Sequence, residues 1–337
     1  MIDQITLAHG NGGRLMQELI SGLFVKYFDN SILANQGDSA ILPAEKDSLA
    51  FTTDSFVIDP IFFPGGDIGK LAVCGTVNDL AVSGAKPLYL SASFILEEGF
   101  PLKDLEKIIQ SIAAETKRAK VLIVTGDTKV VSRGQADKVF ITTTGIGRLP
   151  QKNKKISSGS MITPGDRIII NGPVGNHGMA VMLARESFNF RSKIVSDCAS
   201  LHFLIHNVLS VSSGVKFMRD ATRGGVATIL YEICKKSGFG VDVDESTVPV
   251  DDNVRSICEI LGMDPLYVAN EGKVIMIASH KEAGKIVNVM KKDPLGKKAA
   301  IIGEVTANHP NKAILQTLSG GTRIIDQLIG DQLPRIC

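Results

Sequence analysis

Aspartates recur at predicted strand ends along this chain, where a carboxylate can do chemistry. Asp38 begins one predicted strand at 38–42, and Asp54 lies at the end of the next, at 49–55. Asp127 follows the buried run at 121–124. Carboxylates in such positions suit a hard cation such as Mg²⁺, although an aspartate can also simply end a strand. These three residues are candidate metal ligands.

A polar pair, Asn78-Asp79, interrupts an otherwise apolar segment at 68–84 that predicts a buried helix. Burying polar groups costs free energy unless partners or ligands satisfy them. Asp79 is therefore a further candidate for binding a metal ion or a phosphate.

A charged corner at 219–225, Arg-Asp-Ala-Thr-Arg-Gly-Gly, joins a predicted strand at 215–218 to an apolar helix at 226–234. Asp220 and Arg223 could face a metal ion or a phosphate there. Alternatively, Asp220 or Thr222 caps the helix.

Phosphate binding has further candidates elsewhere in the chain. His9 and Gly12 belong to a glycine-rich loop at 9–13 before a predicted helix, where unpaired N–H groups favour anions, although a plain turn also fits. Lys129 could pair with phosphate or form a surface ion pair with its neighbour. Glu271, just before a predicted strand at 274–277, is either a base or a turn residue. His202 and His206 are spaced as a metal pair, but no third ligand is evident nearby.

The chain ends on Cys337, behind a glycine- and proline-containing stretch that lacks helical or strand periodicity. A thiol on a mobile segment can enter an active site, or it can be incidental in a frayed tail. The five cysteines form no CxxC pair, and the N-terminus does not resemble a secretory signal, so we expect a reduced, cytoplasmic protein.

Length and charge limit the remaining possibilities. The 337 residues predict two domains, at 1–150 and 151–329, with a tail at 330–337. The net charge is +2 with no basic stripe and 5% aromatic residues, so no nucleic-acid partner is expected. No apolar run approaches the roughly 18 residues of a membrane span.

The segments 78–85, 126–129 and 220–225 resemble the aminoimidazole ribonucleotide synthetase-like (PurM-like) ATP-binding superfamily, over nearly the whole chain. Within it, residues 9–13, 125–131 and the Pro-Arg-Ile-Cys ending are similar to a family of hydrogenase maturation proteins. The resemblance implies a mixed α+β and α/β, PurM-like two-domain fold. An N-terminal sheet domain would form a homodimer, a larger C-terminal domain would follow, and ATP would bind between them.

The resemblance also implies a reaction. A carbamoyl group on Cys337, delivered by the carbamoyltransferase HypF, would be dehydrated with ATP and Mg²⁺ from a thiocarboxamide to a thiocyanate. The cyanide would pass to iron on a HypC–HypD complex for nickel–iron hydrogenase. Glu271 would act as base and Lys129 as the phosphoryl-stabilising cation, with Arg223 or His9 as alternatives. The nucleotide and metal candidates are His9, Gly12, Asp38, Asp54, Asp79, Asp127, Lys129, Asp220 and Arg223.

Other functions remain open. Selenophosphate synthetases usually carry a reactive cysteine or selenocysteine in the N-terminal glycine loop, whereas the first cysteine here is Cys74, in a predicted helix. Thiamine monophosphate kinases have no use for a terminal thiol. A non-catalytic nucleotide-binding scaffold that offers its tail to a partner is the alternative from a different class.

Overall fold

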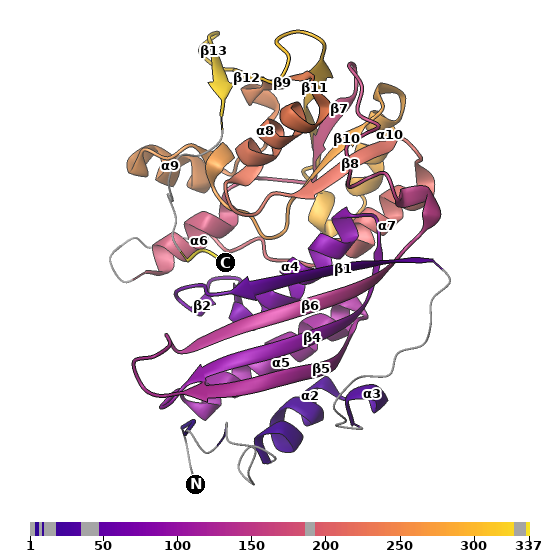
Figure 1. Ribbon diagram of the computed structural model, residues 1–337. Coiled ribbons are helices and arrows are strands. Elements are labelled where there is room, and N and C mark those ends of the chain that lie inside the picture. Colours follow the sequence, from indigo (N-terminus) through magenta and orange to yellow (C-terminus); the bar gives the residue numbers. More distant parts are fainter. Residues whose placement is uncertain (1–3, 7–8, 10–17, 35–46, 186–192, 327–334) are drawn as a thin grey trace.

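The computed structural model describes residues 4–6, 9, 18–34, 47–185, 193–326 and 335–337 (Figure 1). Two sheets organise these residues. A four-stranded sheet in the order β1-β6-β4-β5 lies in the lower half of Figure 1, and a seven-stranded sheet in the order β13-β12-β9-β11-β7-β10-β8 lies in the upper half. In the described part of the chain, no helix is both long and apolar enough to cross a membrane.

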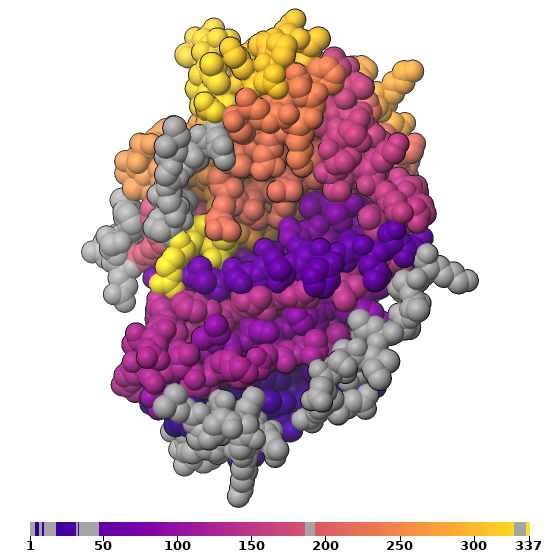
Figure 2. All heavy atoms as spheres, in the orientation of Figure 1, coloured from indigo at the N-terminus to yellow at the C-terminus, as the bar shows by residue number. Residues whose placement is uncertain are grey.

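The four-stranded sheet comprises β1 (Ser48–Phe56), β4 (Lys86–Glu97), β5 (Leu122–Val131) and β6 (Val139–Leu149). Strands β1 and β4 run antiparallel to β6, and β5 runs parallel to β4. Helices α4 (Ile68–Val82) and α5 (Leu102–Ala119) cover one face. The other face is open, with Phe51 71% and Leu49 60% exposed (Figure 2).

Helix α4 is buried on nearly every side, as its apolar sequence predicts. Asp67 begins it, since its carboxylate accepts hydrogen bonds from the backbone N–H groups of Gly69 and Lys70 at 2.7 and 3.1 Å. The helix packs against α5 and the four-stranded sheet, and it also contacts α7 (His202–Val211) and β8 (Val215–Asp220). It therefore links the two halves of the molecule.

The seven-stranded sheet contains β7 (Arg167–Ile170), β8, β9 (Gly240–Asp244), β10 (Val274–Ala278), β11 (Ala300–Thr306), β12 (Ala313–Gln316) and β13 (Thr322–Ile325). Only the pair β9–β12 among these is parallel. The helices of this half are α6 (Asn176–Ala184), α7, α8 (Gly225–Ser237), α9 (Asp252–Leu261) and α10 (His280–Met290).

Short elements complete the described chain. They are η2 (Ile20–Val25), α2 (Lys26–Phe28), α3 (Ser31–Ala34), β2 (Phe62–Phe63), β3 (Gly66–Asp67), η3 (Gln151–Asn153), η4 (Glu245–Thr247), η5 (Pro265–Tyr267) and η6 (Pro294–Gly296).

One local prediction is wrong: Asp127 does not follow the end of a strand. Strand β5 continues through it to Val131, because its pairing with β4 runs on to that residue after a register shift. Gly126 allows close approach of the two strands. A Cβ atom there would lie 2.2 Å from the carbonyl oxygen of Ala92 on β4.

A candidate active site between the two sheets

Three aspartates from different elements gather where α4 meets both sheets. Asp54 on β1 and Asp79 on α4 lie within hydrogen-bonding reach of each other, and the Thr52 hydroxyl donates to Asp79 Oδ2 at 2.7 Å. Asp220 is the last residue of β8, and it lies close enough to Asp54 and Asp79 for their charges to raise its pKa. The structure thus brings together three carboxylates that are far apart in sequence.

Crowding and burial disturb the ionisation of this acidic group. Burial, followed by the charge of Asp79, raises the pKa of Asp54 to about 6, while the charge of Arg223 opposes the rise. Burial and the same neighbour raise the pKa of Asp220 to about 7. A bound cation would relieve this repulsion.

A Mg²⁺ ion fits this group chemically, because it prefers carboxylate oxygens and usually keeps ligands from water or phosphate. Among the described residues, however, no three carboxylate, imidazole or thiol groups stand in metal-binding geometry. Asp54, Asp79 and Asp220 would therefore hold the ion together with other ligands rather than enclose it alone.

The charged corner at 219–225 leaves its side chains available. Helix α8 begins at Gly225 with no side-chain cap, so neither Asp220 nor Thr222 takes the capping role that the sequence also allowed. Gly224 and Gly225 both have positive φ, and a Cβ on Gly225 would lie 2.4 Å from the Leu266 carbonyl oxygen. The turn places Arg223 in an exposed position, from which its charge lowers the pKa of Asp54.

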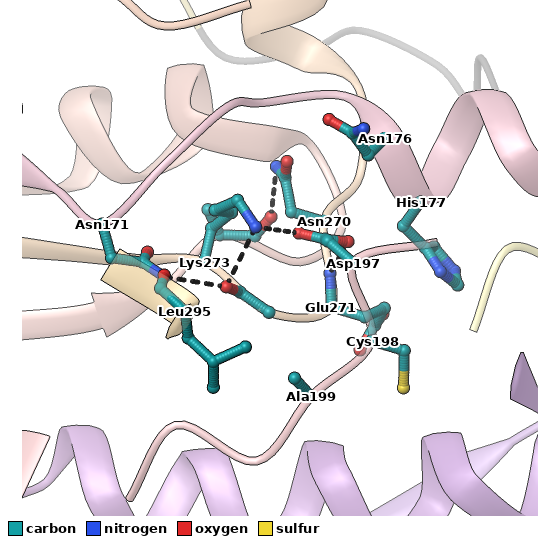
Figure 3. A network of polar contacts seen from close by, with 12 residues as sticks. Asn171, Asn176, His177, Asp197, Cys198, Ala199, Asn270, Glu271, Lys273 and Leu295 are labelled. Atoms are coloured by element: carbon teal, nitrogen blue, oxygen red, sulfur yellow. Dashed lines mark hydrogen bonds and ion pairs between the residues drawn. The ribbon is translucent and has the colours of Figure 1, made fainter. Parts of the chain in front are cut away.

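Glu271 lies buried beside this group, in the network drawn in Figure 3. Its backbone N–H donates to Asp197 Oδ1 at 3.0 Å, and Asp197 forms a buried ion pair with Lys273 at 2.8 Å. Its Oε1 atom has no hydrogen-bond partner among the described residues. Burial, then the charges of Asp220 and Asp197, raise the Glu271 pKa well above its usual value. A buried, unpartnered carboxyl group of this kind suits proton transfer.

Asn78, the neighbour of Asp79, has a structural role. Its side-chain amide donates to the Ala199 carbonyl oxygen at 3.0 Å, and its oxygen accepts from the Leu201 N–H at 2.7 Å. These bonds fix the segment before α7 against α4. Of the polar pair, the buried Asn78 therefore holds neighbouring elements together, and the half-buried Asp79 belongs to the acidic group.

The end of the chain docks beside this network. The Val57 N–H donates to the Cys337 carbonyl oxygen and the Asp59 N–H to that of Arg335, both at 3.1 Å, just beyond β1. Figure 2 shows the yellow end of the chain against β1. Ile336 is 2% exposed, and its carbonyl oxygen lies 2.8 Å from His177 Nε2.

Arg335 anchors the same segment. Its Nε donates to the Val57 carbonyl oxygen at 2.9 Å, and its guanidinium pairs with Asp137. The sequence predicts a mobile tail, yet residues 335–337 are held in place by these contacts. Residues 330–334 lie outside the described part of the chain.

Cys337 differs from the other four cysteines, which are all buried. A hydrogen bond to Cys74, together with burial, raises the pKa of the Cys198 thiol, and burial raises the pKa of Cys234 to about 12 and of Cys258 to about 11. Such thiols stay protonated and unreactive. Cys337 alone is partly exposed.

Asp127 and Lys129 lie apart from the acidic group of their own chain. Asp127 stands in a cross-strand row with Ser93, Thr142 and the exposed Ser55, whereas Asp54 stands in the next row with the buried Thr143. Successive rows point to opposite faces of a sheet. Asp127 therefore faces the open side, where it pairs with Lys129 at 2.8 Å.

The remaining predicted residues are at the N-terminus. His9 is buried, and its Nδ1 accepts from the Thr6 backbone N–H at 3.1 Å and contacts the Thr6 hydroxyl at 2.9 Å. None of its contacts reaches the acidic group. Gly12 and Asp38 lie outside the described residues.

Sequence reasoning missed four residues that shape this site: His177, Asp197, Lys273 and Arg335. His177 belongs to the glycine-containing connection at 171–178, which carries no sequence signal for contact with the tail. Asp197 and Lys273 are far apart in sequence and lie in no recognisable motif. Although burial opposes it, the charge of Lys273 lowers the pKa of Asp197.

Comparisons with known proteins agree with this architecture. Residues 36–149 match the N-terminal domain, and residues 163–316 the C-terminal domain, of AIR synthase related proteins. The carbamoyl dehydratase HypE of Cupriavidus necator is 49% identical over 336 residues, covering 99% of this chain and 95% of its own.

Two solved structures are similarly close. A crystal structure of hydrogenase maturation protein HypE in complex with ATP has a TM-score of 0.94 and 45% identity, covering 98% of this chain and 99% of its own. A HypE–HypF complex has a TM-score of 0.80 and 47% identity, covering 92% and 99%. The sequence identity over the full length is far higher than that of proteins that share only a fold. This chain therefore belongs to the HypE family of carbamoyl dehydratases, hydrogenase maturation proteins with the two-domain PurM-like fold.

Proposed function

We propose that this protein uses ATP to dehydrate a carbamoyl group carried on its own Cys337. The observation that carries the proposal is the docked end of the chain, with Cys337 partly exposed and the adjoining Ile336 carbonyl oxygen on His177. The thiocyanate formed would supply the cyanide ligand of iron in nickel–iron hydrogenase.

The reaction balances around the carbamoyl carbon. The carbamoyl oxygen attacks the γ-phosphorus of ATP, and ADP leaves. The nitrogen then loses two protons, the C–O bond breaks with phosphate as leaving group, and a C≡N bond forms on sulfur. The oxygen atom ends in phosphate, so one thiocarboxamide and one ATP give one thiocyanate, ADP and phosphate.

Glu271 is our candidate for the base that takes a proton from the carbamoyl nitrogen. Its buried position and its unpartnered oxygen support this role, because a carboxylate with a raised pKa is a stronger proton acceptor once ionised. Asp197, which accepts from the Glu271 N–H, would hold the Glu271 backbone in position.

Asp54, Asp79 and Asp220 would hold Mg²⁺ with the nucleotide phosphates, and Arg223 lies near enough to Asp54 to approach the same anion. The ion would supply charge neutralisation of the triphosphate. Asp38, Gly12 and His9 remain proposed nucleotide or metal contacts through the N-terminal segment.

A homodimer is proposed through the open face of the four-stranded sheet. Apolar side chains of Leu49, Phe51 and Ile95 are exposed there, and monomers rarely leave such a patch uncovered. Lys129 and Asp127 share that face. They would therefore act on a nucleotide at the boundary with a second copy rather than within one chain.

The solved complex of a relative with HypF makes a carbamoyltransferase of that kind the proposed donor. A HypC–HypD complex is the proposed acceptor of cyanide. A cytoplasmic location is supported by the five cysteines, none of which forms a disulfide bond in the described part of the chain, as suits a reducing compartment. The proposed domain limit at 150/151 is supported by the change of sheet between Leu149 and Arg167, whereas the proposed limit at 329/330 lies outside the described residues.

The test is ATP hydrolysis by the carbamoylated protein compared with Cys337→Ala. Cys198→Ala serves as the control, since that thiol is buried. We expect ATP turnover that depends on carbamoylation to vanish in Cys337→Ala alone. Unchanged turnover in that variant would refute self-modification and would favour a nucleotide-binding scaffold.

A further inference from the structure

A cavity of about 500 Å³ opens between the two halves of the molecule, away from the acidic group. The N-terminal half contributes the start of β4, the end of α5 and the end of β6, and the C-terminal half contributes one face of α7. The cavity shares no lining residue with the acidic group, with Glu271 or with the docked end of the chain. Its size suits a small-molecule ligand.

The cavity is strongly basic. Lys86, Lys120, Arg148 and Lys152 line it, and no aspartate or glutamate does. Asp47 approaches Arg148 Nε, but at 3.8 Å it is too far for a hydrogen bond. Four permanent positive charges around one space repel each other unless an anion joins them.

Two of the lining side chains bury polar atoms that have no hydrogen-bond partner among the described residues. One atom is Arg148 Nε, and the others are both ring nitrogens of His202, a side chain only 8% exposed. The Ala119 carbonyl oxygen lies near the His202 ring without forming a hydrogen bond of normal geometry. Unsatisfied buried donors are costly, so a ligand that accepts from them would be favoured.

A metal ion fits this space poorly. His206 lies one turn beyond His202 and also lines the cavity, but no third metal-binding group joins them in the described part of the chain. The surrounding lysines and arginine would repel a cation. The paired histidines are therefore better explained as part of an anion site.

We propose that this cavity binds a phosphate-bearing anion, with Arg148 and His202 as its direct hydrogen-bond donors. Lys86, Lys120 and Lys152 supply positive charge at its rim, where all three are exposed. The exposed Phe203 ring also lines the cavity. Its centroid lies 4.0 Å from that of the His202 ring, with the rings tilted by 42°, and 5.5 Å from Lys120 Nζ. It offers an apolar platform for an organic group attached to the phosphate.

Anion binding is coupled to protonation of His202. Burial, helped by the charges of His206 and Lys120 and opposed by the Ala119 carbonyl oxygen and the charge of Glu115, lowers the pKa of His202 to about 4. The ring is therefore neutral at neutral pH when the cavity is empty. A phosphate beside it favours the charged form, so binding should tighten as pH falls toward the pKa of the liganded ring.

Calorimetry on the nucleotide-free protein with two probes, inorganic phosphate and AMP, tests the site, since binding at the acidic group would not depend on Arg148. Arg148→Gln removes one donor, and Lys103→Gln removes an exposed lysine outside the cavity as a matched control. We expect Arg148→Gln to weaken binding about tenfold or more, because a charge-assisted hydrogen bond is lost, and Lys103→Gln to leave it unchanged.

The two probes separate the sources of phosphate. Tighter binding of AMP would indicate that the cavity accepts a nucleotide over Phe203, and equal binding would indicate the phosphate group alone. The His202 ring resonance, assigned with His202→Gln, should shift with the same affinity. Should Arg148→Gln fail to fold, the exposed pair Lys120→Gln and Lys152→Gln gives the same test. Neither probe binding at millimolar concentration, or equal binding by wild type and Arg148→Gln, would overturn the proposal.

Discussion

At the scale of single residues, the surroundings of Glu271 favour the protonated form of its carboxyl group. The residue is 3% exposed, and its carboxyl group lacks a hydrogen-bond partner for one oxygen among the described residues and lies near the charges of Asp220 and Asp197. Such an arrangement lowers the stability of the fold, and it is found most often at functional sites. The same is true of Asp54 and Asp220, which crowd Asp79 across two sheets.

Replacing Glu271 by glutamine keeps the volume and removes the proton acceptor. We expect conversion of carbamoylated Cys337 to thiocyanate to slow by about 10²-fold or more, the usual contribution of a positioned base. Nucleotide binding should persist, because Glu271 forms no part of the acidic group. Single-turnover mass spectrometry measures the rate, and Glu259→Gln, on the exposed side of α9, is the control. A rate within twofold of wild type would exclude Glu271 as the base.

Asp220 predicts a pH dependence of stability. Its pKa is raised to about 7, so the folded state binds the proton more tightly than the unfolded state does. The contribution of Asp220 to the free energy of unfolding is fully present below its pKa in the unfolded state, about 4. It is lost as pH rises through its pKa in the folded state, about 7. In urea unfolding without metal, Asp220→Asn should reduce the loss of free energy of unfolding over this window by on the order of 2 kcal/mol, after discounting for partial exposure. An identical pH profile in both proteins would contradict the assignment, and added Mg²⁺ should stabilise wild type more than the variant.

At the scale of elements, α4 and the segment after β1 decide where the chemistry can occur. Helix α4 brings Asp79 to Asp54 on β1 and to Asp220 on β8, and the residues after β1 receive the end of the chain through two backbone hydrogen bonds. Backbone pairing of this kind positions a segment without depending on most of its side chains.

Arg335 tests whether this docked arrangement is the reactive one. Arg335→Ala removes the bond to the Val57 carbonyl oxygen and the ion pair with Asp137, so a smaller fraction of tails should be docked. We expect dehydration to slow about three- to tenfold, while carbamoylation by the partner is not slowed. Asp137→Asn removes the same ion pair from the other side and should show a smaller loss. Faster dehydration in either variant would mean that docking holds the thiol away from the reaction.

Local signals in the sequence predicted many of these elements. The buried helix at 68–84, the corner at 219–225 and the acidic residues around them were recognisable because apolar runs and glycines report local structure. The sheet face on which Asp127 and Lys129 lie could not be predicted. A change of one residue in a strand's register moves every side chain to the opposite face, and the register depends on the neighbouring strands. The Asp197–Lys273 pair and the contact of His177 with the tail join distant segments, and single-sequence patterns carry no signal for them.

At the scale of the whole molecule, we expect the open sheet face to determine how copies assemble. Leu49 and Phe51 on β1 and Ile95 on β4 expose apolar surface between hydroxyl pairs such as Thr53–Thr144 and Ser55–Thr142. Asp127 and Lys129 stand on this same face. Assembly and catalysis are thus expected to depend on one surface.

Phe51→Glu should convert a dimer to a monomer, because it places a charge in the apolar centre of that face. Sedimentation velocity at micromolar concentration measures the change. Ile260→Glu is the matched control, since Ile260 is 64% exposed on α9, outside the sheet. We expect the monomer to lose ATP-dependent dehydration as well, as Lys129 would no longer face a second copy. A wild-type monomer, or a dimer that survives Phe51→Glu, would contradict this interface.

The central claim is that Cys337 carries the group that ATP dehydrates. Intact mass spectrometry of the protein after incubation with its carbamoyltransferase, before and after addition of ATP and Mg²⁺, tests it most directly. The account predicts the gain of one carbamoyl group, located at Cys337 by fragmentation, followed by the loss of one water when ATP is added. A carbamoyl group found elsewhere, or one that ATP leaves unchanged, would contradict it.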